Sequence, residues 1–151
     1  MVIDDSIVRG TTLERSILKM LDRLEPKKIV IVSSAPQIRY PDCYGIDMSR
    51  LKDFVAFRAM IALVRVHGLE SELASVYDRC IGSEGDASPE NHLQKLYNHF
   101  TDVQISAKIS EIVKPEGMNA EVEVIYQTVE NLHKAIPHHS GDWYFTGDYP
   151  T

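Results

Sequence analysis

The sequence predicts an α/β fold that contains part of a parallel sheet, flanking helices and a mainly helical elaboration. Residues 1–34 have the pattern of a strand, a loop, a helix and a second strand. Residues 29–32 are a β-branched apolar run, typical of a parallel strand that is covered on both faces. Apolar residues recur at helical spacing from residue 49 onward. We therefore expect three parts, at residues 1–48, 49–120 and 121–151.

The chain opens on a short apolar strand that ends in two adjacent acids, Asp4 and Asp5. A loop leads from them into a helix, and the free N–H groups of such a loop and helix N-terminus bind anions. Gly10 lets the backbone come close to a ligand, and Thr11 and Thr12 add hydroxyl donors. The two carboxylates would repel a phosphate, but they suit a pair of hydroxyls or a divalent cation. A ribose 5-phosphate has the groups that satisfy the whole stretch.

A helix follows the loop, and a second strand follows the helix. Thr11 and Glu14 have the spacing of a capping box, and Pro26 ends the helix. The loop then lies at the carboxyl end of the first strand, where open α/β sheets bind their ligands. The dozen residues after the second strand form an irregular loop, in which Arg39 and Tyr40 are candidates for a ligand contact, a domain contact or surface packing.

Helices dominate the middle of the chain. Apolar stripes predict four helices, at residues 49–67, 69–80, 90–100 and 102–113. Alternating apolar residues at 103–109 would also fit a strand. Glycine, serine and proline predict a mobile loop at 81–89. The chain then closes with a strand at 122–126, a helix at 128–136 and an aromatic-rich tail from residue 143.

The composition limits the classes of function. The chain has 151 residues and a net charge of −6, so we expect neither a general nucleic-acid surface nor a surface for anionic membranes. The longest apolar run, residues 59–64, is far too short to span a bilayer, and no signal peptide is visible. Two isolated cysteines indicate a reduced, cytoplasmic protein, and the histidines lack the spacing of a metal site.

The order of residues in the opening loop resembles the binding motif for 5-phosphoribosyl 1-diphosphate (PRPP) in type I phosphoribosyltransferases. The run Asp-Asp-Ser-Ile-Val-Arg-Gly-Thr-Thr at 4–12 is similar to the amidophosphoribosyltransferase family in particular. Tyr-Gly-Ile-Asp at 44–47 adds to this resemblance. So does Phe-Thr-Gly-Asp-Tyr-Pro-Thr at 145–151, which is similar to the Phe-Thr-Gly-x-Tyr-Pro-Thr ending of the family's phosphoribosyltransferase domain. Between residues 58 and 120 the resemblance is weak.

The resemblance implies a type I phosphoribosyltransferase-like sheet and a role for each residue of the loop. Asp4 and Asp5 would bind the ribose hydroxyls, directly or through Mg²⁺. The 5-phosphate would lie in a cradle of the seven residues that follow, Ser6, Ile7, Val8, Arg9, Gly10, Thr11 and Thr12. The implied reaction transfers ammonia from glutamine to PRPP and gives 5-phosphoribosylamine, in the first step of de novo purine biosynthesis.

The resemblance also implies parts that residues 1–151 do not supply. These are an N-terminal glutaminase domain and the upstream half of the phosphoribosyltransferase domain. We therefore expect the chain to be the C-terminal portion of that domain and to be inactive alone. Through the unpaired edge of its first strand it would either self-associate or bind the rest of the enzyme. The alternative is a non-catalytic regulatory module that binds PRPP or a nucleotide. A base-salvage phosphoribosyltransferase fits less well, because that group has neither the Tyr-Gly-Ile-Asp segment nor the Tyr-Pro-Thr ending.

Some members of the family carry an iron–sulfur cluster held by four cysteines. Here Gly141 and Tyr144 stand at two of the cysteine positions, and Asp42 stands at another, next to Cys43. Two thiols cannot supply four cluster ligands, so we expect no iron–sulfur cluster.

Overall fold

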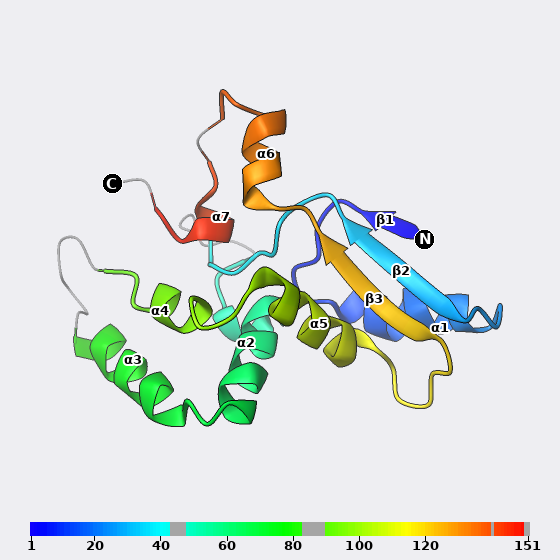
Figure 1. The fold of residues 1–151 in the computed structure, drawn as a ribbon, viewed down its shortest axis with the longest axis horizontal. Coiled ribbons are helices and arrows are strands. Elements are labelled where there is room, and N and C mark those ends of the chain that lie inside the picture. The colour runs from blue at the N-terminus through cyan, green and yellow to red at the C-terminus, as the bar shows by residue number, and fades with distance from the viewer. Residues whose placement is uncertain (43–47, 83–89, 140, 150–151) are drawn as a thin grey trace.

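Three strands form a parallel sheet in the computed structural model, which describes residues 1–42, 48–82, 90–139 and 141–149. The strands pair in the order β1-β2-β3 and comprise β1 (Val2–Asp4), β2 (Lys28–Ser33) and β3 (Glu121–Tyr126). Figure 1 shows the sheet at one end of the molecule and the helical middle of the chain beside it. The predicted α/β class and the parallel strand–helix–strand unit at the start of the chain are confirmed.

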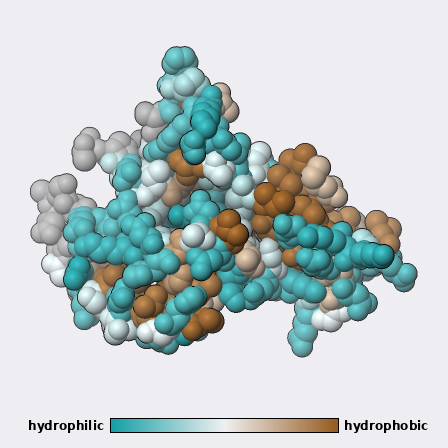
Figure 2. All heavy atoms as spheres, viewed as in Figure 1, coloured by the Kyte–Doolittle hydropathy of each residue, from teal (hydrophilic) through white to brown (hydrophobic). Residues whose placement is uncertain are grey.

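The two faces of the sheet differ in burial. On one face Ile29, Ile31 and Val124 belong to the buried core. On the other face Ile3 and Ile125 keep 68% and 43% of their surface exposed. Figure 2 shows apolar surface gathered over the sheet. The prediction that the strand at 29–32 is covered on both faces holds fully for one face only, because Ile29 and Ile31 are buried whereas Val30 and Val32 are half-buried.

The first helical segment runs without a break from residue 11 to residue 22. It contains a π-helical turn, η1 (Leu13–Ile17), which leads into α1 (Leu18–Asp22). The Glu14 N–H donates to the Gly10 carbonyl over 3.0 Å and closes the first turn. The predicted capping box is wrong: Thr11 already lies inside this turn, and no side-chain cap hydrogen bond forms at Thr12.

The middle of the chain is helical, as predicted. Its elements are a 3-10 turn, η2 (Leu51–Asp53), and the helices α2 (Val55–Val66), α3 (Glu70–Gly82), α4 (Leu93–Tyr97) and α5 (Asp102–Val113). Helix α5 packs against both α2 and β3, with Ile105 and Ile109 fully buried. The strand alternative at 103–109 is wrong, because Thr101 and Gln104 form a capping box that starts a helix there. Most of the predicted loop at 81–89 lies outside the described residues.

The last segments fold back over the loop that follows β2. They contain α6 (Val129–Ala135) and α7 (Trp143–Thr146). The Tyr144 carbonyl accepts hydrogen bonds from the N–H groups of Arg39 and Tyr40, at 2.8 and 3.1 Å. The Tyr149 hydroxyl donates to the Pro41 carbonyl over 2.7 Å. The tail and the loop after β2 therefore form one packed unit.

Two further predictions concern the segment at residues 44–47 and the possibility of a membrane-spanning helix. The Tyr-Gly-Ile-Asp segment at 44–47 lies outside the described residues. Among the helices that are described, none has both the length and the apolar character needed to cross a bilayer.

Candidate functional site

The loop that was predicted to bind a ligand surrounds a cavity at the carboxyl end of β1. The cavity has a volume of about 330 Å³, and its lining comes from one continuous stretch of the chain. The lining residues are Asp4, Ser6, Ile7, Val8, Arg9, Gly10, Thr11, Thr12, Leu13 and Ile17. Every predicted site residue except Asp5 therefore lines this space, and Asp5 is exposed beside it.

Backbone hydrogen bonds fix the two acids at the end of the sheet. The Ser34 N–H donates to the Asp4 carbonyl over 2.9 Å, and the Ala35 N–H donates to the Asp5 carbonyl over 3.1 Å. The Asp5 carboxylate accepts the Ser6 N–H at 2.8 Å, which turns the chain into the loop. The acids are thus held by the backbone that continues from β2, with Asp4 lining the cavity and Asp5 exposed next to it.

The Asp4 carboxyl is in an unfavourable place for a negative charge. Burial, followed by the neighbouring Asp5 carboxyl, raises the pKa of Asp4 above its usual value. A divalent cation or a pair of hydroxyl donors placed between the two acids would remove this penalty, so the residues fit Mg²⁺ or a diol. Within the described ranges, no three His, Cys, Asp or Glu side chains gather into a ready-made metal site. Oxygens of the ligand would therefore have to complete the coordination of Mg²⁺.

The loop and the start of the helix present hydrogen-bond donors to the cavity. The first helical hydrogen bond comes from Glu14, so the N–H groups between Gly10 and Glu14 precede it and lack intrahelical partners. The Thr12 hydroxyl makes no cap hydrogen bond and is exposed. Such groups attract an anion. The π-helical turn directly after the loop is of a kind that is frequent at functional sites.

Two of the predicted site residues also hold the loop onto the core. Ile7 is buried, with 3% of its surface exposed. The Val8 carbonyl accepts the N–H of Val55, at the start of α2, over 2.8 Å. Any contact of Ile7 or Val8 with a ligand would therefore come from the backbone.

Gly10 is required for a reason that the sequence did not reveal. Its φ is +71°, a region that residues with a Cβ rarely adopt. A Cβ on Gly10 would lie 2.9 Å from Cγ1 of Val113 and 3.4 Å from Cγ2 of Val55. The missing side chain makes room for α2 and α5, so the close approach that Gly10 permits in this structure is to the core.

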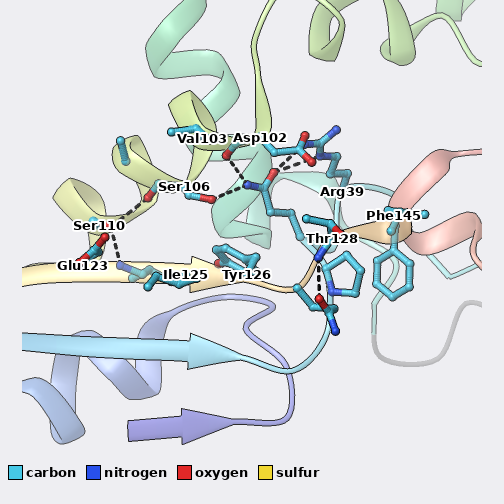
Figure 3. A pocket seen from close by; sticks show the side chains of 16 residues that line it. Arg39, Asp102, Val103, Ser106, Ser110, Glu123, Ile125, Tyr126, Thr128 and Phe145 are labelled. Carbon is cyan, nitrogen blue, oxygen red and sulfur yellow. Dashed lines mark hydrogen bonds and ion pairs between the residues drawn. The ribbon is translucent and has the colours of Figure 1, made fainter. Parts of the chain in front are cut away.

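A second cavity of about 400 Å³ lies between α5, β3 and α7, and we call it the α5 groove (Figure 3). Gln37 crosses its end, is buried, and donates to the Ser106 hydroxyl and to the Asp102 carbonyl over 2.8 Å each. Arg39 in turn donates to the Gln37 side-chain carbonyl over 2.7 Å and pairs with the Asp102 carboxylate. These polar groups satisfy one another, which leaves a largely apolar groove.

The candidates Arg39 and Tyr40 are not part of the loop cavity. Arg39 lines the α5 groove and lies 5.1 Å from the centre of the Tyr97 ring. Tyr40 is buried and packs against the same ring. Sequence reasoning missed the groove, because its walls come from four segments that are distant in the chain.

Asp42 and Tyr144, which stand where some members of the resembling family have cysteine ligands of an iron–sulfur cluster, lie next to each other. The Tyr144 hydroxyl donates to the Asp42 carboxylate over 3.2 Å. This hydrogen bond adds to the contacts between the tail and the loop after β2.

The chain is similar over part of its length to amidophosphoribosyltransferases. It is 49% identical to that of Haemophilus influenzae across 68% of this chain and 24% of the relative. It is 38% identical to that of Pasteurella multocida across 59% of this chain and 18% of the relative. It is 46% identical to that of Escherichia coli across 37% of this chain and 11% of the relative. The chain thus spans less than a quarter of each of these relatives. No family model and no solved structure matches it.

Proposed function

We propose that this chain provides the PRPP-binding part of an amidophosphoribosyltransferase and has a type I phosphoribosyltransferase-like sheet. The observation that carries the proposal is the cavity at the carboxyl end of β1, lined by the acid and the donor-rich loop of one short motif. Partial similarity to amidophosphoribosyltransferases supports the same assignment. Residues 1–48 form the binding unit, residues 49–120 the helical elaboration and residues 121–151 the closing segment.

Each part of the cavity has a role in this proposal. The N–H groups of residues 6–12, with the Thr11 and Thr12 hydroxyls, hold the 5-phosphate. Asp4 and Asp5 accept hydrogen bonds from the ribose hydroxyls or hold Mg²⁺ together with oxygens of the ligand. When bound, Mg²⁺ would neutralise negative charge on the diphosphate of PRPP.

The reaction is displacement of diphosphate from the anomeric carbon of PRPP by ammonia, with glutamine as the source of the ammonia. Its transition state has oxocarbenium character, so positive charge develops on the ribose ring. Asp4 and Asp5 fix the ring and place negative charge near it. Release of ammonia from glutamine and binding of the diphosphate leaving group are assigned to segments other than residues 1–151. We therefore expect the chain alone to bind ligand without turnover.

Calorimetric titration with ribose 5-phosphate, with and without Mg²⁺, tests the binding site. A Thr12→Val variant removes an exposed hydroxyl at the cavity and leaves the core intact. We expect it to weaken binding about tenfold to a hundredfold, the effect of one lost hydrogen bond to a charged group. Ser71→Ala, at an exposed position of α3, is the matched control and should bind like the original chain. Equal binding by Thr12→Val and the original chain would contradict the assignment of the loop.

A second function is a regulatory module that binds PRPP or a nucleotide and catalyses nothing. The cavity at the carboxyl end of β1 would serve this function too, because binding alone needs only the acid pair and the loop. The DNA upstream of the Met1 codon separates the two functions. An in-frame glutaminase domain that begins with cysteine supports the enzyme, and a start codon at Met1 supports the module.

A further inference from the structure

A buried hydroxyl near the acid pair has no hydrogen-bond partner. The Tyr126 hydroxyl is shielded from solvent and neither donates nor accepts a hydrogen bond. Figure 3 shows Tyr126 at the carboxyl end of β3. A buried polar group without a partner is destabilising, so its presence in a folded protein calls for an explanation.

The sheet register places Tyr126 in line with Asp4. Asp4 pairs with Ser33, and Ser33 pairs with Tyr126, so the three side chains leave the same face of the sheet. The Cα atoms of Asp4 and Tyr126 are thus two strand spacings, about 10 Å, apart. The residue between them is small, and its hydroxyl is already bonded to the Ala35 carbonyl at 2.8 Å. Ser33 therefore neither blocks nor satisfies the Tyr126 hydroxyl.

The electrostatics agree with this placement. Burial raises the pKa of the Tyr126 hydroxyl well above its usual value, and the negative charge of Asp4 raises it further. Tyr126 therefore stays protonated and is available as a donor towards Asp4. The Asp4 carboxyl interacts with the side chain of Asp5 in this structure.

We propose that Tyr126 is a positioning residue, whose hydroxyl donates a hydrogen bond to the Asp4 carboxylate when a ribose occupies the site. This inference rests on the proposed function of the loop. A ligand that separates the two acids frees Asp4 from Asp5, and the Tyr126 hydroxyl then holds the charged carboxylate towards the ribose hydroxyls. The 5-phosphate end of the site, at residues 6–12, does not involve Tyr126.

The test compares two ligands and two tyrosine variants. Tyr126→Phe keeps the ring and removes the hydroxyl, and Tyr77→Phe does the same at an exposed tyrosine of α3. Each protein is titrated calorimetrically with ribose 5-phosphate and Mg²⁺, and separately with inorganic phosphate. We expect Tyr126→Phe to bind ribose 5-phosphate about threefold to tenfold more weakly, and inorganic phosphate as before. Tyr77→Phe should match the original chain with both ligands.

The remaining outcomes separate this inference from the proposed function. If Tyr126→Phe binds ribose 5-phosphate as tightly as the original chain, the inference is wrong and the proposed site stands. If both ligands weaken together, Tyr126 has a structural role and the inference is also wrong. If the original chain binds neither ligand, the proposed function fails and the inference fails with it.

Discussion

At the scale of single residues, the loop both lines the cavity and packs against the core. Asp4 and Thr12 face the cavity, whereas Gly10 and Ile7 attach the loop to the helices. A substitution in this loop therefore tests binding only if the altered residue is one that faces the cavity. Gly10→Val, an obvious choice from the sequence, would disturb packing first.

Replacement of Gly10 by alanine should destabilise the fold strongly. The new Cβ would be strained by the positive φ and would overlap Val113, so the free energy of unfolding should fall by about 2–4 kcal/mol. Gly117→Ala is the control, because Gly117 has a φ of +76° and nothing within 4 Å of the added Cβ. Urea unfolding of both variants measures the difference. Equal losses would show that the contact with α5 does not matter.

Replacement of Asp4 by asparagine should have opposite effects on stability and binding. The folded pKa of Asp4 lies above its usual value of 3.8, so the folded chain holds more protons than the unfolded chain between the two values. The free energy of unfolding therefore falls as pH rises through that window and stays lower above it. Asp4→Asn should remove this penalty and raise stability at neutral pH by roughly 0.5 kcal/mol, since solvent screens the partly exposed carboxyl.

Thermal unfolding of Asp4→Asn at pH 7 and calorimetry with ribose 5-phosphate and Mg²⁺ measure the two effects. We expect a higher melting temperature together with weaker binding. A variant that is less stable at pH 7 would show that the Asp4 charge contributes to the fold rather than opposing it.

At the scale of elements, local pattern predicted most helices and strands. The runs at 29–32 and 122–126 lie within β2 and β3, and the helix predicted at 102–113 matches α5. The pattern failed at Thr11, because the predicted N-cap residue lies inside a helix that begins at residue 11. Tertiary packing of the loop decided that boundary. The α5 groove could not be predicted either, because its lining comes from four distant segments of the chain.

Strand β1 is an edge strand among the described residues, and Ile3 stands exposed on it. Exposed apolar strand edges recruit other chains, so we expect concentration-dependent self-association. Ile3→Lys should suppress it, because a charged, strongly hydrated side chain on an exposed edge strand opposes edge-to-edge pairing. Val66→Lys, at an equally exposed apolar residue of α2, is the control. Sedimentation velocity measures the result, and a chain that stays monomeric at high concentration would contradict the prediction.

At the scale of the whole molecule, the loop proposed to bind the ligand lies at the end of a sheet that has one well-covered face. The acid pair, the loop and the tail motif could be identified from the sequence, because each consists of a few neighbouring residues. The burial of the second sheet face was not predicted correctly, because an apolar strand pattern does not tell which segments pack against each face. Residue Tyr126 was missed for the same reason, since only the register places it in line with Asp4.

The central claim is that the loop at residues 6–12 holds the phosphate of a ribose 5-phosphate group and that Asp4 and Asp5 hold its ribose. Amide chemical-shift mapping of the isotope-labelled chain, titrated with ribose 5-phosphate and Mg²⁺, tests it residue by residue. With ribose 5-phosphate and Mg²⁺, we expect the largest amide shifts on residues 4–14. With inorganic phosphate, we expect shifts of the loop amides but not of the Asp4 and Asp5 amides. Shifts confined to the α5 groove, around Gln37 and Ser106, or no shifts at millimolar ligand, would contradict it.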